Sequence, residues 1–150
     1  MNCPMSSRRG SRGFTLIEIV TVLGVAGVLS SIAWPSFQGS LQKARRAEAM
    51  MAMAQLQIAQ ERWYANRGRY GSLDELRLPA RTSAGHYQLV VSDADAQGYV
   101  AVALASGAQA GDAMCRQLRL TVAGGTTTHA SGPDADAAND AAANRRCWNF

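Results

Sequence analysis

Apolar residues are concentrated in one block near the start of the chain. Residues 14–34 hold a single ionisable side chain, Glu18. At about 1.5 Å per residue, this block makes a helix of about 30 Å, which matches the hydrocarbon thickness of a bilayer. Arg8, Arg9 and Arg12 precede the block and predict that its N-terminal end faces the cytoplasm. The pattern predicts a membrane-spanning helix over residues 14–35.

The next segment, residues 36–66, has the period of an amphipathic helix. Small and apolar residues recur at spacings of three and four and define one helix face: Ala49, Ala52, Leu56, Ala59 and Trp63. Pro35 removes a backbone donor, so we expect it to kink or interrupt the helix between the two segments. Asn66 and Gly68 are typical helix stop signals. One helix is therefore predicted from Phe14 to about Asn66.

The remaining part of the chain, residues 67–150, has the alternating pattern of short strands. The predicted strands cover residues 87–91, 99–104, 118–122 and 126–129, and Gly124-Gly125 is expected to form the last turn. Short consecutive strands favour an antiparallel meander whose apolar face the helix covers. The predicted fold class is α+β, a long N-terminal helix packed on an antiparallel sheet of about four strands.

Charge narrows the possible functions of the chain. The net charge is +4, but residues 67–150 hold 8 basic and 8 acidic side chains. Much of the excess positive charge therefore belongs to the three arginines that precede the apolar block. Net charge therefore predicts no strong nucleic-acid footprint on the head.

Catalytic and metal-binding patterns are missing from the sequence. No nucleophile–base pattern or phosphate-binding loop occurs, and His86 and His129 stand alone, so we expect neither an enzyme nor a cofactor. Asp134, Asp136 and Asp140 suggest calcium, but the glycine and the bidentate glutamate of an EF-hand loop are missing. A surface loop without a metal is the preferred interpretation.

Three kinds of segment compete to explain the apolar block. A secretory signal is shorter and is followed by a small-residue cleavage site, which does not occur after Trp34. A plain signal anchor fits the length but leaves Glu18 unexplained. A carboxylate inside a membrane span costs on the order of 3 kcal/mol at mid-membrane and less near an interface. We therefore expect Glu18 to have a function.

The residues around Glu18 form a specific motif. The run Gly13-Phe14-Thr15-Leu16-Ile17-Glu18, with basic residues before it and the apolar block after it, resembles the signature of type IV pilins and type II secretion pseudopilins. The resemblance implies cleavage between Gly13 and Phe14 by a prepilin peptidase and N-methylation of Phe14. It also implies that Glu18 pairs with the N-terminal amine of a neighbouring subunit, and that the helix between Gly27 and Pro35 can unwind in fibres.

The same resemblance divides the chain into four parts. Residues 1–13 are a cleaved leader, 14–35 a transmembrane and fibre-core helix, 36–66 an amphipathic helix, and 67–150 a periplasmic or extracellular head. Cys3 lies in the leader, which leaves Cys115 and Cys147 as an even pair in a secreted domain. The ending Cys147-Trp148 resembles the disulfide-bounded loop of type IV pilins, which implies a Cys115–Cys147 bond. Free buried thiols are the alternative.

The function that these features imply is that of a structural subunit, most like a minor pilin of a type IV pilus. Its partners would be the prepilin peptidase, other pilins, the assembly machinery and the inner membrane, which it leaves for the extracellular fibre. Two alternatives stay open: a type II secretion pseudopilin, and a minor pilin that binds DNA for uptake. The last would use four arginines that a disulfide would bring together: Arg116, Arg119, Arg145 and Arg146.

Overall fold

The computed structural model describes residues 13–148 and divides the chain into two units, Met1–Phe37 and Gln38–Phe150. We call the second the head unit. Residues 1–12, which make up all but the last residue of the predicted leader and include Cys3, lie outside the described residues. Helix α1 spans Leu16–Arg67 and contributes to both units. It is not interrupted at Pro35, contrary to one of the two expectations for that residue, because a missing N–H removes one ladder bond and leaves its neighbours intact.

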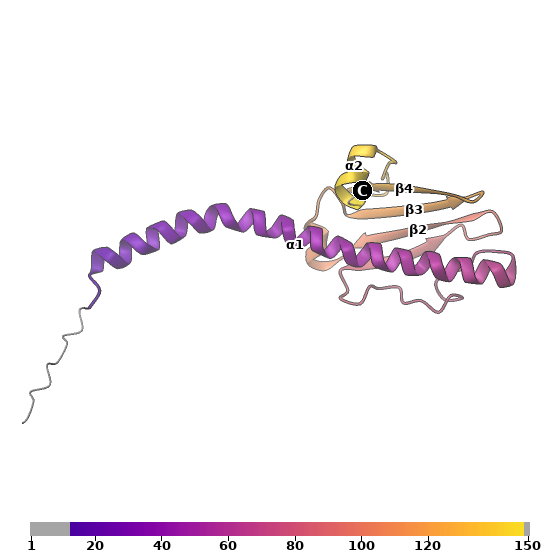
Figure 1. Ribbon diagram of the computed structural model, residues 1–150, viewed down its shortest axis with the longest axis horizontal. Coiled ribbons are helices and arrows are strands. Elements are labelled where there is room, and N and C mark those ends of the chain that lie inside the picture. Colours follow the sequence, from indigo (N-terminus) through magenta and orange to yellow (C-terminus); the bar gives the residue numbers. More distant parts are fainter. Residues whose placement is uncertain (1–12, 149–150) are drawn as a thin grey trace, which may run out of the picture. The chain divides into compact units, whose positions relative to one another are not determined.

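The head unit contains a four-stranded antiparallel sheet in the order β1-β2-β3-β4. Its strands are β1 (Tyr87–Ser92), β2 (Gly98–Ala105), β3 (Gln117–Ala123) and β4 (Thr126–Gly132). Gly124 and Gly125 both have positive φ angles, 55° and 78°, which suits the tight turn between β3 and β4. In Figure 1 the second half of α1 runs along this sheet. The predicted α+β class and all four predicted strands are confirmed.

One face of the sheet and one face of α1 form the core. The register places Leu89, Ala103 and Leu118 in one row across β1, β2 and β3. These side chains belong to the same buried cluster as Ala49, Met53 and Leu56 of α1. The small alanines on β2 leave room for larger side chains above them, and the whole cluster excludes water, which is the main favourable contribution to folding.

The buried face of α1 differs slightly from the predicted stripe. Met53 and Gln60 are buried, with 1% and 0% of their surface exposed, whereas Ala59 and Trp63 are only partly covered. Gln60 lay off the predicted stripe because its side chain is polar. Its amide is satisfied locally, since Nε2 donates to the carbonyl of Gly71 at 2.7 Å and Oε1 accepts from the Gly71 N–H at 2.8 Å. Two hydrogen bonds thus compensate the burial of a polar group.

A second helix, α2 (Ala141–Trp148), was not predicted from the sequence. Asp140 lies just before it, and its carboxylate accepts the N–H of Ala143 at 2.7 Å, which is the geometry of an N-terminal cap. Asn144 donates to the carbonyl of His129, and the indole of Trp148 donates to the carbonyl of Ala130. These bonds attach α2 to strand β4, and Asp140 has a structural role there.

Two long-range connections hold the C-terminal segment to α1 and β3. The disulfide joins Cys115 to Cys147, the pair implied by the family resemblance, and the two Cα atoms are 5.5 Å apart. Arg46 of α1 forms a buried ion pair with Asp112, with Nε and Oδ2 2.6 Å apart. Arg46 also donates through Nη1 to the carbonyl of Arg146 at 2.7 Å. One guanidinium therefore contacts the chain shortly before each of the two cysteines, at Asp112 and at Arg146.

The Arg46–Asp112 pair belongs to a larger polar cluster. The Gln109 amide donates to Asp112 at 3.1 Å and to the Tyr87 hydroxyl at 3.0 Å. Burial is the main cause that raises the pKa of Tyr87 to about 12, so this hydroxyl stays protonated at neutral pH. Gln109 comes from the short 3-10 helix η1 (Gly107–Gly111). The cluster thus positions η1 against α1.

Glu48 connects α1 to the loop before β1. Its Oε1 accepts the N–H of Ala84 and its Oε2 lies 2.7 Å from Nδ1 of His86. Desolvation raises the pKa of this carboxyl, but hydrogen bonds from Thr82, His86 and Ala84 together outweigh it, and the net result is a lowered pKa. The ionised carboxylate therefore stabilises the folded head unit.

We predict that Arg46→Met lowers the free energy of unfolding by about 3–5 kcal/mol, because it leaves the Asp112 carboxylate buried without its cation. The matched control is Arg45→Met on the same turn, which we expect to change stability by less than about 0.5 kcal/mol. The measurement is denaturant unfolding of the full chain in detergent, followed by tryptophan fluorescence. Equal stability of the two variants would contradict the role given to the buried pair.

We predict that Glu48→Gln destabilises the head unit in a pH-dependent way. The lowered pKa of Glu48 means that its stabilising contribution is complete above the ordinary value of 4.5 and is lost as the pH falls through the folded value. The difference in unfolding free energy between the wild type and Glu48→Gln should therefore be largest near neutral pH and shrink in acid. A difference that stays constant between neutral pH and acid would argue against this account.

Candidate functional site

The N-terminal unit presents an almost continuous apolar surface. Leu16 is 82% exposed and Val28 is 65% exposed. Two polar side chains are satisfied inside the helix, since the hydroxyls of Thr21 and Ser31 donate to the carbonyls of Ile17 and Val28. The described part of α1 contains one stretch that is long and apolar enough to cross a membrane. Such a surface needs an apolar environment, either lipid or other helices.

The first turn of α1 has its own local chemistry. Thr15 precedes the helix, and its hydroxyl oxygen accepts the N–H of Glu18 at 3.3 Å. Threonine at the cap with glutamate three residues later is the pattern of a capping box. The negative charge of Glu18 in the first turn also complements the helix dipole. Glu18 thus favours the start of the helix as well as being available to a positively charged partner.

The disulfide and the Arg46–Arg146 contact together gather basic side chains from three segments. Arg116 follows Cys115, and Arg145 and Arg146 precede Cys147, so the covalent bond brings all three together. Arg46 contacts the backbone of Arg146, which places Lys43 and Arg45 of α1 at the same end of the head unit. We define the basic patch by its members: Lys43, Arg45, Arg116, Arg145 and Arg146.

The patch has little negative charge to compensate it. Asp112 is occupied by Arg46, and no ion pair among residues 13–148 involves a member of the patch. Lys43, Arg116, Arg145 and Arg146 are exposed, and Arg45 is partly so. Arg116 donates through Nε to the carbonyl of Ala110, which orients its guanidinium without neutralising it. The arrangement suits an extended polyanion or an anionic surface.

Arg119, the fourth predicted arginine, has a different environment. It lies on β3, is partly buried, and donates to the carbonyl of Ala135 in the loop before α2. The structure therefore groups three of the four predicted arginines and gives Arg119 a contact with that loop. Lys43 and Arg45 were not among the predicted contacts. Their membership of the patch depends on the distant contact between Arg46 and Arg146.

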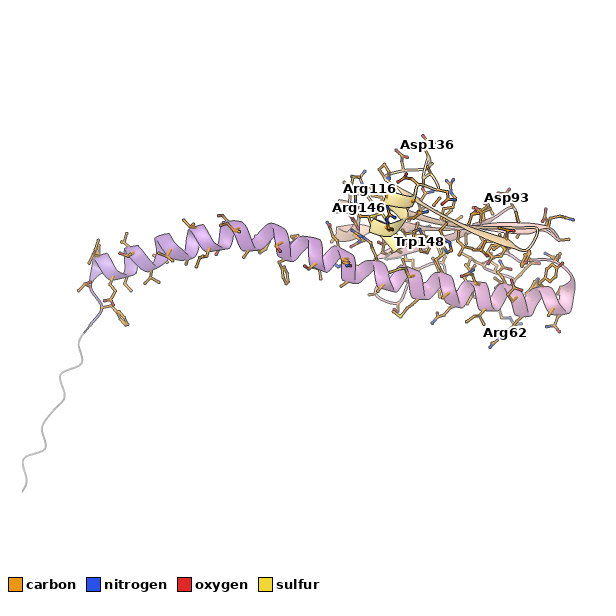
Figure 2. The ribbon with its side chains drawn as sticks, turned by 45° about the horizontal axis from the view of Figure 1, so that its top comes forward. Arg62, Asp93, Arg116, Asp136, Arg146 and Trp148 are labelled. Carbon is orange, nitrogen blue, oxygen red and sulfur yellow. A yellow bond between two sulfur atoms is a disulfide. The ribbon has the colours of Figure 1, made fainter. Side chains whose placement is uncertain are left out.

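Figure 2 shows Arg116 and Arg146 near the disulfide and α2, with Arg62 toward the other end of the head unit. There, a hollow of about 580 Å³ is lined by Arg62, Trp63, Arg67 and Arg77 among others. The guanidinium of Arg67 lies 4.9 Å from the centre of the Trp63 ring. This stacking is a local stabilising contact of α1's last turns. Arg62 thus serves as a reference cation remote from the patch.

The histidines and aspartates have structural partners. His86 is paired with Glu48, and His129 packs edge-on against Trp148 with ring centres 4.7 Å apart. Burial lowers the pKa of His129. Asp134 accepts the N–H of Asp136, two residues along the same loop. Among the residues that the structure describes, no group of three or more His, Cys, Asp or Glu side chains is arranged to hold a metal ion.

Comparison with known families gives two matches. The family described as type IV minor pilin ComP, DNA uptake sequence receptor, matches residues 35–119, which is more than half of the chain. The prokaryotic N-terminal methylation motif matches residues 8–34. The two matches together include α1, β1, β2 and the first residues of β3.

Similar proteins come from both pilus and secretion systems. The fimbrial protein EcpC of Eikenella corrodens is 29% identical over 97 residues, which is 63% of each chain. A fimbrial protein of Neisseria meningitidis is 32% identical over 58% of this chain and 45% of its own. The type II secretion system core protein G of Pectobacterium carotovorum is 36% identical over 43% of this chain and 41% of its own. The chain thus spans about half the length of such relatives.

The two family matches agree with the structural observations. The methylation motif falls on the basic leader and the exposed apolar helix, and the minor pilin match falls on the helix and sheet of the head unit. By its match over more than half its length, the chain belongs to the type IV minor pilin family described as ComP, DNA uptake sequence receptor.

Proposed function

We propose that this chain is a structural subunit of a type IV pilus, present as a minor component of the fibre. The observation that carries the proposal is the apolar surface of α1 between Phe14 and Trp34, which its own unit leaves exposed. In the membrane, lipid covers this surface, and in a fibre the equivalent helices of neighbouring subunits cover it. Assembly therefore exchanges one apolar environment for another.

Maturation follows from the motif at the start of this helix. A prepilin peptidase cuts between Gly13 and Phe14, and the new amine of Phe14 is methylated. Inside a fibre, this amine pairs with Glu18 of a neighbouring subunit. The pairing is favourable because either charge alone is costly in an apolar core, whereas the two together offset each other's desolvation. It also fixes the axial position of one subunit relative to the next.

A secretion pseudopilin is the main alternative structural role. Relatives named as secretion core protein G match 43% and 45% of the chain, so likeness to relatives does not by itself discriminate between the two systems. The match of the head unit to a minor pilin family favours the pilus.

A second proposed function is the reception of DNA by the basic patch. The matched family is described as a DNA uptake sequence receptor, and the patch provides five cations that no ion pair among the described residues neutralises. Such a surface binds the phosphate backbone and positions a duplex without reading its sequence. Base recognition would need further contacts beyond the patch.

We predict that Glu18→Val and Glu18→Gln both insert in the membrane and both enter fibres poorly beside wild-type subunits. Glutamine is the matched control, because it keeps the length of the side chain and the capping pattern but removes the charge. The measurement is quantification by mass spectrometry of sheared surface fibres. The wild type should appear there at low stoichiometry, with an N-terminal peptide that begins at methylated Phe14.

Several outcomes of this measurement would contradict the assembly proposal. Normal incorporation of Glu18→Gln would mean that the cap, and not the charge, is what assembly needs. A processed wild-type chain found only in the cell envelope would favour the pseudopilin role. An unprocessed chain would remove the prepilin interpretation altogether.

We predict that replacing Arg145 and Arg146 together by glutamine weakens binding of duplex DNA and reduces its salt dependence. Each lost phosphate contact lowers the slope of log affinity against log salt by about one, so a loss of about two is expected. The control is Arg62→Gln with Arg81→Gln, two cations outside the patch, which should leave the slope unchanged. Wild-type protein in detergent that shows no salt-dependent binding to duplex DNA would refute DNA reception.

A further inference from the structure

The position of the basic patch within the chain suggests a second anionic ligand. Two of its members, Lys43 and Arg45, belong to the first turns of α1 in the head unit, which begins at Gln38. The other three are held at those turns by the Arg46–Arg146 contact and the disulfide. The patch therefore lies at the end of the head unit where the chain enters from the apolar segment.

Chain connectivity limits how far this patch can be from a membrane. Lys43 follows Trp34, the last residue of the apolar block, by nine residues of continuous helix, which is a contour length of about 14 Å. While the segment stays helical, this is an upper limit on the distance between Trp34 and Lys43, whatever direction the helix takes. The polar headgroup layer of a bilayer is about 5–8 Å thick and the screening length at physiological salt is about 8 Å. The headgroup thickness and the screening length together are about equal to the contour length between Trp34 and Lys43.

The chemistry of the patch fits that location. Arginine and lysine near an anionic leaflet are attracted to lipid phosphates, and guanidinium groups bind phosphate oxygens through paired N–H donors. Three acidic groups of the head unit already have partners within the head unit. Asp112 is paired with Arg46, Glu48 with His86, and Asp140 caps α2. Little negative charge near the patch would repel an anionic lipid.

We propose that the basic patch binds the phosphate headgroups of anionic lipids while the subunit is anchored in the membrane. Lipid and DNA then compete for the same cations, so the patch becomes available to DNA only when the subunit leaves the bilayer for the fibre. The lipid contact stands by itself, whereas this control of DNA access rests on the proposed reception of DNA. The arrangement prevents a stored subunit from holding DNA at the membrane surface.

The test compares full-length protein in nanodiscs of phosphatidylcholine alone with nanodiscs of equal parts phosphatidylcholine and phosphatidylglycerol. Arginines are modified with a dicarbonyl reagent and the rates are read by mass spectrometry of the peptides that carry Arg116, Arg145 and Arg146. The internal control is Arg62 with Arg77, which lie outside the patch. Modification of the patch should be about fivefold slower in the anionic discs. High salt should restore the rate, because it screens the attraction.

Three results would overturn the lipid contact. Equal patch modification in the two kinds of disc would mean that the headgroups do not bind there. Equal slowing at Arg62 and Arg77 would mean that the reagent, and not the patch, responds to the anionic surface. Protection in phosphatidylcholine discs by soluble glycerol phosphate alone would assign the site to a free anion and would also overturn the membrane assignment.

A DNA-binding measurement distinguishes failure of the lipid contact from failure of the proposed DNA reception. Labelled duplex is titrated into protein in detergent and into the two kinds of disc, with Arg145→Gln/Arg146→Gln as the patch variant. Binding in detergent without protection in anionic discs would refute the lipid contact and keep DNA reception. Protection in anionic discs without binding in detergent would keep the lipid contact and refute DNA reception and its control by lipid. Protection together with patch-dependent binding that anionic discs reduce supports both.

Discussion

The rest of the structure depends on one constraint. The single helix α1 must suit two different environments along its length. In its first half, α1 has apolar side chains on all sides and leaves them to lipid or to other helices. In its second half, it has to bury one face against its own sheet and keep the other faces polar. Ala49, Met53 and Leu56 provide the buried face, and the alanines of β2 allow the helix to approach the sheet closely.

The head unit is small, so a disulfide and a buried ion pair between distant segments contribute to its stability. The disulfide restricts the unfolded chain and is worth about 3–4 kcal/mol for a loop of this length in the chain-entropy model. The Arg46–Asp112 pair is buried, and Gln109 and the Arg146 carbonyl satisfy part of its remaining hydrogen-bonding capacity. Such a pair gives the helix and the C-terminal segment one preferred arrangement, and it penalises loss of either partner strongly.

The same connections explain where the basic patch comes from. Its cations lie at residues 43–45, 116 and 145–146, and only the disulfide and the Arg46 contact bring these segments together. The head unit has a small net charge, with 12 basic and 10 acidic side chains, yet one end of it is cationic, because Asp112 and Glu48 are paired and Asp140 caps α2. A surface of this kind binds phosphate groups through charge and not through shape, which is why DNA and anionic lipid are both suitable ligands.

The sequence by itself determined the features that depend on local patterning. The length of the apolar block, the motif around Glu18, the alternation in the four strands and the Gly124-Gly125 turn each have short-range causes, and the α+β class followed from them. The tertiary structure decided what depends on distant partners. Gln60 is buried because Gly71 satisfies its amide, α2 forms where Asp140 caps it and β4 supports it, and Arg119 donates to the carbonyl of Ala135 in the loop before α2. The physical reason is that burial and hydrogen-bond satisfaction are properties of contacts between segments, which no single stretch of sequence contains.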